Sequence, residues 1–278
     1  MLADAKARVT GLPGTLSDPE FRLFRDLMYK LAGISLSDAK KQLVAGRLAR
    51  RLRQLELESY GDYFKRLQKD GGEMQTAVDL LTTNETYFFR EPKHFDFLRN
   101  HALPGLKSGG TVRVWSGACS SGEEPYTIAM VMAEVLGGRP WEIVASDLSS
   151  RVLDKAKEGR YTMEEAEGIP RPLLAKYCLK GIGSQEGTFM VKPELRRRIT
   201  FRQVNLNVAL PDLGQFDVIF LRNVMIYFDI ETKRQVIRRL LPLLRPGGYF
   251  MLSHSENLNG ISDAMKTVQP SIYRKPDA

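Results

Sequence analysis

The sequence has few of the residues that build disulfide frameworks and metal centres. Its 278 residues include only two cysteines, Cys119 and Cys178, and one pair in a chain of this length does not form a disulfide framework. The three histidines, His94, His101 and His254, show neither HxH nor HExxH spacing. The sequence therefore predicts no metal site.

Long apolar stretches and an excess of acidic residues are also lacking. No apolar run approaches the roughly 20 residues of a membrane span, so direct membrane insertion is not expected. The first residues lack the apolar core of a signal peptide, and we expect a cytoplasmic protein. The chain has 41 basic and 33 acidic residues, for a net charge of +8. An excess of basic residues of this size favours a polyanionic partner, but it does not choose among nucleic acid, a membrane surface and an acidic protein.

Residues 1–82 carry only helical patterns. Apolar residues recur at helical spacing after a candidate N-cap at Ser17 or Asp18, and Gly33 fits the end of this helix. Three further helices are predicted, from residue 37 or 38 to about 57, from 59 to 69, and from 73 to 81. Because no strand signal interrupts them, we predict an all-α N-terminal domain, followed by a linker at 83–92.

Residues 93–278 alternate between strand and helix patterns. Strands are predicted at 112–115 and 141–147, within 216–228, and at 249–253. This order predicts an α/β domain with a doubly wound, Rossmann-like sheet of mostly parallel strands, seven in number. Glycines flanked by the runs TFMV and RITF predict a small antiparallel β insertion at about 178–201.

The first predicted strand of this domain ends in small residues, 116–122, followed by Glu123 and Glu124 at a helix N-terminus. Two carboxylates there would repel the pyrophosphate of NAD or FAD, whereas S-adenosylmethionine (SAM) has no phosphate and offers an ammonium, a sulfonium and ribose hydroxyls. Asp147 ends the second strand, where an acid can bond both ribose hydroxyls. A generic α/β turn with a helix-capping aspartate fits these features as well.

A set of motifs runs through the chain in a fixed order. They are TTNETYFFRE (82–91), RVWSGACSSGEEPY (113–126), ASDLSSRVLDKAKEGRY (145–161), VNL (204–206), FDVIFLRNVMIYFD (216–229), LLRPGGYFMLSHSEN (243–257) and Ile272-Tyr273. Their combination resembles the chemotaxis-receptor glutamate methyltransferases of the CheR family over nearly the whole chain, helical domain and β insertion included. The resemblance implies a SAM-dependent methyltransferase fold. It also implies a protein-glutamate O-methyltransferase that acts on the cytoplasmic helices of methyl-accepting chemoreceptors.

The resemblance also implies roles for single residues. The residues implied to contact SAM, or its product S-adenosyl-L-homocysteine, are Asn84, Thr86, Arg90, Glu123, Asp147, Asn205, Leu206, Arg222 and Asn223. Arg90 and Tyr227 are implied to be catalytic residues that face the substrate glutamate. A glutamate side chain has an unperturbed pKa of about 4.3, so it is ionised at neutral pH and needs no general base. It needs one oxygen held in line with the methyl group, which hydrogen bonds from Arg90 and Tyr227 can provide.

Two surfaces are candidates for receptor binding. On the second predicted helix Val44, Leu48, Leu52 and Leu55 form an apolar stripe. The basic residues that lie largely outside this stripe are Lys40, Arg47, Arg50, Arg51 and Arg53. They form either a solvated charged face or, as the resemblance suggests, a docking surface for the acidic methylation region of a receptor. Such docking would recruit the enzyme to membrane-bound receptor arrays.

The β insertion is the second candidate surface. In some CheR members it binds a peptide at the receptor C-terminus, which tethers the enzyme and raises its effective concentration. An edge that contains Gly181 and Gly183 could accept such a peptide by β-augmentation. A purely structural insertion fits the sequence equally well.

Two other functions are compatible with a basic SAM-binding chain. A nucleic-acid methyltransferase often carries Asn or Asp, two prolines and an aromatic residue near the fourth strand, whereas this chain has Arg222-Asn223-Val224-Met225. It also lacks an aromatic-rich basic stripe for stacking bases, so no nucleic-acid partner is expected. The other function is a non-enzymatic SAM-binding module, against which the presence of Arg90 and Tyr227 argues.

Overall fold

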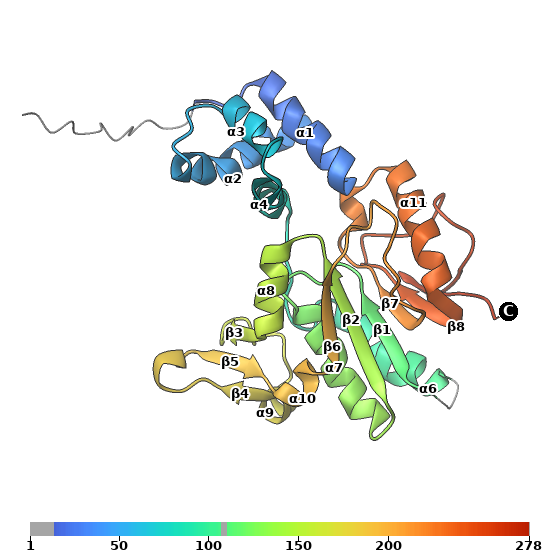
Figure 1. Cartoon of the computed structure of the whole chain (residues 1–278). Helices are drawn as coiled ribbons and strands as arrows, with labels where there is room; N and C mark the ends of the chain where they lie inside the picture. Colours follow the sequence, from blue (N-terminus) through green and yellow to red (C-terminus); the bar gives the residue numbers. More distant parts are fainter. Residues whose placement is uncertain (1–13, 107–109, 278) are drawn as a thin grey trace, which may run out of the picture. The chain divides into compact units, whose positions relative to one another are not determined.

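The chain divides into two compact units, Met1–Thr82 and Thr83–Ala278 (Figure 1). The computed structural model describes residues 14–106 and 110–277. Within these residues, no helix is both long and apolar enough to cross a bilayer.

The regular elements in the described part of the first unit, residues 14–82, are all helical, as predicted. They are α1 (Asp18–Ala32), η1 (Asp38–Lys40), α2 (Lys41–Gln54), α3 (Tyr60–Leu67) and α4 (Gly71–Leu81). A capping box starts α1, in which the Ser17 side chain and the Glu20 carboxylate each accept a hydrogen bond from the other's backbone N–H. Gly33, at φ 70°, adopts the left-handed conformation that ends the helix.

The core of this unit comes from apolar stripes on its helices. Phe24 of α1, Leu48 of α2 and Tyr63 of α3 are fully buried. The second helix ends at Gln54 rather than at about residue 57, so that boundary was wrong. The cause is Glu56, whose φ of 54° is left-handed and incompatible with a continuing helix. No glycine marks this position, so the early end could not be predicted from the residue pattern.

The second unit is built on a seven-stranded sheet. Its strands are β1 (Val112–Ser116), β2 (Trp141–Asp147), β6 (Ile199–Gln203), β7 (Phe216–Phe220), β8 (Leu244–Met251), β9 (Lys266–Gln269) and β10 (Ile272–Arg274). They lie in the order β6-β2-β1-β7-β8-β10-β9, parallel from β6 to β8 and antiparallel at β10 and β9. Since β1 has β2 on one side and β7 on the other, the order reverses at β1, where open α/β sheets bind ligands.

Helices of several lengths connect these strands. They are α5 (Pro92–Phe97), the π-turn η2 (Leu98–Ala102), α6 (Leu103–Gly105), α7 (Glu123–Leu136), α8 (Ser150–Glu158), α9 (Arg171–Tyr177), η3 (Gly183–Gln185), α10 (Pro193–Arg196), η4 (Met225–Tyr227), α11 (Ile230–Leu240) and η5 (Leu241–Leu243). The most buried of them, α7, follows β1 directly and is buried from Tyr126 to Met132. The predicted fold class is confirmed.

The antiparallel insertion exists, but its predicted bounds of 178–201 were wrong. It consists of β3 (Arg160–Thr162), β5 (Thr188–Val191) and β4 (Cys178–Lys180) in that order, and it lies beside α9 and α10 (Figure 1). The predicted last strand, RITF, instead belongs to β6 and pairs in parallel with β2 in the main sheet. A short apolar run does not reveal which sheet it joins, and a three-residue strand such as β3 is too short to show a period.

Candidate cofactor and active site

The loop after β1 is shaped by close backbone packing. At Gly117 a Cβ atom would lie 3.0 Å from Leu221 Cδ1, and the Gly117 N–H donates to the carbonyl of Phe220 in the neighbouring strand. At Gly122, where φ is 100°, a Cβ atom would lie 2.8 Å from the Tyr161 hydroxyl. Gly122 requires glycine, whereas at Gly117 a side chain would fit only if Leu221 shifted. These glycines bring the start of α7 close to the carboxyl ends of β1 and β7.

Asp147 stands at the carboxyl end of β2 with its carboxylate fixed by two backbone donors. Its Oδ2 accepts from the Ser120 N–H and its Oδ1 from the Ser149 N–H, both at 2.9 Å. The Ser120 hydroxyl donates in turn to the carbonyl of Asn84 at 2.8 Å. One residue of the β1 loop therefore joins the acid of β2 to the segment 83–92.

Arg222 links the loop after β7 to two other segments of the site, α7 and residues 83–92. It follows β7, is only 5% exposed, and donates through Nη1 to Glu124 Oε2 at 3.0 Å and through Nη2 to the carbonyl of Arg90. The same Nη2 lies 3.1 Å from Glu91 Oε2. Burial alone would raise the pKa of Glu91, but the neighbouring His94 and the charge of Arg222 lower it to about 2. At neutral pH the buried guanidinium is thus paired with an ionised carboxylate.

The predicted residues of segment 83–92 lie together in the second unit. Arg90 donates to the carbonyl of Glu85 at 2.7 Å, and its guanidinium lies over the ring of Tyr87. Thr86 is half-buried in the same segment. The Phe89 N–H donates to Thr127 of α7 at 3.1 Å, which anchors the segment beside the site.

Glu123 is almost fully buried at the start of α7. It is 2% exposed, and the Ser121 hydroxyl contacts both of its oxygens at 2.9 and 2.8 Å. Burial raises the pKa of Glu123 above its usual value. The neighbouring Glu124, predicted only as the second carboxylate at this helix N-terminus, accepts from Ser116 at 2.7 Å and pairs with Arg222.

Asn205 and Leu206 follow β6, where backbone bonds shape the loop. Asn205 Oδ1 accepts from the Asn207 N–H at 2.9 Å, and the Leu206 carbonyl accepts from Arg239 at 3.1 Å. The ends of β6, β2, β1 and β7 are neighbours in the sheet, so these residues share an edge with Asp147 and Arg222.

The loop that carries Asn223 and Tyr227 is held by Glu256. This buried carboxylate accepts from the backbone N–H groups of Asn223, Ile226 and Ser253 at 3.0, 3.2 and 3.0 Å. Tyr227 lies half-buried at the end of η4. Within residues 14–106 and 110–277, no hydrogen bond joins Tyr227 to Arg90. Glu256 belongs to the motif SHSEN, but sequence reasoning gave it no role.

Two of the five basic residues predicted to bind a partner form hydrogen bonds or ion pairs within the helical unit. Arg47 donates to the carbonyls of Leu81 and Thr82 at 2.9 and 3.0 Å, at the end of α4. Arg51 forms a bidentate pair with the buried Glu73 of α4. The remaining three, Lys40, Arg50 and Arg53, are exposed.

Gly181 and Gly183 form the turn that follows the edge strand β4. A Cβ atom at Gly181 would lie 1.9 Å from the carbonyl of Gln185, and Gly183 has a φ of 57°. Ile182 between them is 82% exposed. Since β4 pairs only with β5 in this sheet, its other edge is open for pairing within the described insertion.

A parallel sheet that reverses at β1, with an acid ending β2 and acids opening α7, has the form of a SAM-binding methyltransferase. Residues 84–274 match the family model of the CheR methyltransferase SAM-binding domain, and residues 19–82 match that of the CheR all-alpha domain. The chain therefore belongs to the CheR methyltransferase family.

Curated relatives agree with this assignment. Chemotaxis protein methyltransferase 2 of Pseudomonas aeruginosa is 45% identical over 91% of this chain and 92% of its own length. Chemotaxis protein methyltransferase of Escherichia coli is 44% identical over 93% of this chain and 91% of its own length. The predicted family, cofactor and enzyme class are thus confirmed: the protein is a SAM-dependent methyltransferase of the chemotaxis type. The predicted roles of single residues stay predictions.

Proposed function

We propose that the protein transfers a methyl group from SAM to glutamate side chains on the cytoplasmic helices of chemoreceptors, and forms methyl esters. One observation carries this proposal. The segment that bears Arg90 is tied directly to the cofactor edge of the sheet, through Ser120 at one point and through Arg222 at another. The residue proposed to bind the substrate thus shares a support with the residues proposed to bind the cofactor.

The charges at the strand ends suit SAM. Asp147 is an oriented acceptor at the end of β2, where ribose hydroxyls bind in this class of fold. The first turn of α7 carries Glu123 and Glu124, which disfavours a phosphate and favours a cationic ligand. SAM supplies a methyl group on a positively charged sulfur. We assign the ribose to Asp147 and place the remaining predicted residues around the adenosine and methionine parts.

Arg90 and Tyr227 are proposed to hold the substrate carboxylate. A guanidinium has five N–H donors, so the bond from Arg90 to the Glu85 carbonyl leaves others that can reach a carboxylate. The Tyr227 hydroxyl can donate to the other oxygen. Fixing both oxygens aligns one of them with the methyl group, and the chain contributes rate through this positioning rather than through a base.

The exposed residues Lys40, Arg50 and Arg53 are proposed to dock the acidic region of a receptor, and this docking recruits the cytoplasmic enzyme to receptor arrays. The open edge of β4 is proposed to accept an extended receptor peptide, with Leu179 and Ile182 exposed beside it. Calorimetry with receptor C-terminal peptides tests the second proposal. A Leu179→Lys variant should bind such a peptide more weakly than the parent protein.

Methyl transfer from labelled SAM to purified receptor cytoplasmic fragments tests the main proposal. We expect label in the fragment, released as methanol by mild base, because esters are base-labile and N-methyl groups are not. A fragment in which the candidate glutamates are replaced by alanine is the matched control. Binding of SAM without transfer to any receptor fragment would favour a non-enzymatic SAM-binding module instead.

A further inference from the structure

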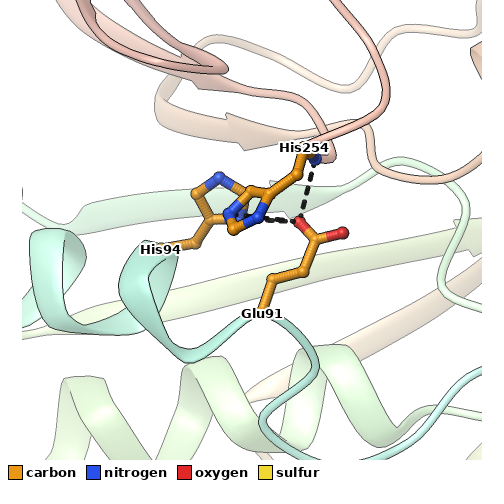
Figure 2. A group of neighbouring side chains, drawn as sticks. All are labelled: Glu91, His94 and His254. Atoms are coloured by element: carbon orange, nitrogen blue, oxygen red, sulfur yellow. Dashed lines mark hydrogen bonds and ion pairs between the residues drawn. The ribbon is translucent and has the colours of Figure 1, made fainter.

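Three side chains outside the proposed catalytic pair meet at one point of the second unit. Figure 2 shows Glu91, His94 and His254, which come from the residue before α5, the first turn of α5 and the loop after β8. Glu91 Oε2 lies 3.2 Å from His94 Nδ1 and 3.8 Å from His254 Nε2. One ligand atom from each of the three lies within 4.8 Å of the others. A carboxylate and two imidazoles are a common donor set for zinc.

His94 is buried without the hydrogen bonds that a buried imidazole requires. Its side chain is 1% exposed, and within the described ranges 14–106 and 110–277 neither ring nitrogen has a hydrogen-bond partner. Buried polar groups in native proteins nearly always have a partner, and a bound ion is one of the reasons for an exception.

The relative positions of Glu91 and His94 fit two ligands of one cation. Glu91 Oε2 and His94 Nδ1 are close enough to hydrogen-bond but are not aligned for it. Two ligands of one ion have this relation, because each is aimed at the ion rather than at the other. In a tetrahedral zinc site with bonds of about 2.0–2.1 Å, neighbouring ligand atoms stand about 3.3 Å apart. The two measured distances, 3.2 and 3.8 Å, bracket this value.

We propose that Glu91, His94 and His254 bind a divalent transition metal ion of the zinc class. The His254 side chain is 51% exposed, which gives the ion a path from solvent and lets this ring rotate to close the site. The three residues supply three ligands, and water completes a four-coordinate site. Within the part of the chain that the structure describes, neither buried cysteine belongs to this group of ligands.

Binding of the ion would disturb Arg222. The Arg222 Nη2 atom lies 3.1 Å from Glu91 Oε2, the same oxygen that faces both histidines. A divalent cation and a guanidinium repel each other and compete for this oxygen, so the ion separates Glu91 from Arg222. If Arg222 serves the cofactor as proposed above, the metal lowers the affinity for SAM. This consequence rests on the proposed function, whereas metal binding itself does not.

Zinc titration of the untagged chain in competition with a chromogenic chelator tests the site. His101 is the matched control, because it is the remaining histidine and is exposed in the same unit. We expect one zinc ion per chain, at least tenfold weaker binding in His254→Gln, and unchanged binding in His101→Gln. Cobalt should give tetrahedral absorption bands without a thiolate charge-transfer band. Equal zinc affinity in His254→Gln and the parent protein, or no zinc binding by the parent, would overturn the proposal.

Calorimetry of SAM with and without zinc tests the coupling separately. We expect zinc to weaken SAM binding in the parent and in His101→Gln, but not in His254→Gln. If zinc binds as expected and SAM affinity does not change, the metal site stands and the coupling through Arg222 is wrong. If zinc does not bind, the site itself is wrong, whatever the fate of the proposed methyl transfer.

Discussion

Each of the two units pairs an arginine with carboxylates, but the two arrangements have different roles. In the helical unit Arg51 pairs with Glu73, and the Tyr63 hydroxyl adds a bond to the same carboxylate at 2.8 Å. This cluster joins α2, α3 and α4, and the Tyr63 ring also stacks on Phe24 of α1. In the larger unit Arg222 joins chain segments 98 and 132 residues away, at the ligand-binding edge of the sheet. The first arrangement supports a helical core, and the second supports a site.

Replacing Arg222 should therefore lower both the stability of the protein and its affinity for SAM. Arg222→Met leaves the partly buried Glu91 and Glu124 without their cation, and breaking a largely buried pair in this way costs up to about 3–5 kcal/mol of stability. We expect this loss together with a strong decrease in SAM affinity. Denaturant unfolding and calorimetry measure the two effects.

Arg238→Met is the control for Arg222→Met, because Arg238 is exposed on α11 of the same unit. It should change neither quantity by more than about 0.5 kcal/mol. If Arg222→Met were as stable as the parent and bound SAM equally well, the comparison between the two units would fail.

Tyr227→Phe separates catalysis from cofactor binding. The change keeps the ring and removes only the hydroxyl that is proposed to hold the substrate carboxylate. A mispositioned reactant can cost about a hundredfold in rate, so we expect a large decrease in receptor methylation at saturating SAM with near-normal SAM affinity and stability. Methylation at the parental rate would make Tyr227 a packing residue of η4.

Asp147→Ala tests the cofactor edge. The carboxylate is held by the N–H groups of Ser120 and Ser149, and it is proposed to bond the ribose. Loss of hydrogen bonds to a charged group costs roughly 1.5–3 kcal/mol, which calorimetry would show as weaker SAM binding. S-adenosyl-L-homocysteine should be weakened to a similar degree, because it shares the ribose. Unchanged affinity for both would remove Asp147 from the site.

Glu73→Gln tests the helical unit. Hydrogen bonding to Arg51 lowers the pKa of Glu73 below its usual value. Its stabilising effect is thus present above the unfolded pKa of about 4.3 and is lost as the pH falls through the lower folded value. At pH 7 we expect the substitution to cost about 1–3 kcal/mol of stability, with SAM affinity unchanged. The free energies of unfolding of the parent and the variant, measured with denaturant, should converge at acid pH. A difference that stays constant with pH would contradict the stabilising role of the Arg51–Glu73 pair.

The fold was predictable from sequence because its signals are local. Strand ends such as Asp147 and loops such as 116–122 are read directly from periodicity and small residues. The network of hydrogen bonds and ion pairs around Arg222 could not be predicted in this way, because only the folded sheet brings its partners close together. Likewise a helical wheel places Arg47 and Arg51 outside the apolar stripe of α2, but cannot show that α4 supplies acceptors for them. The group proposed to bind a metal was not predicted, because His94 and His254 are 160 residues apart in the sequence.

The smallest expected effect concerns the basic face of α2. If Lys40, Arg50 and Arg53 dock an acidic receptor region, Arg50→Gln together with Arg53→Gln should weaken receptor binding by about 1 kcal/mol or less per charge, because exposed charges are well screened. The effect should shrink at high salt and should appear mainly in the association rate. Arg238→Gln on the other unit removes an exposed charge as a control and should leave binding unchanged. Equal association rates for the double variant and the parent at low salt would show that this face is a solvated surface with no role in docking. The receptor would then contact another part of the protein.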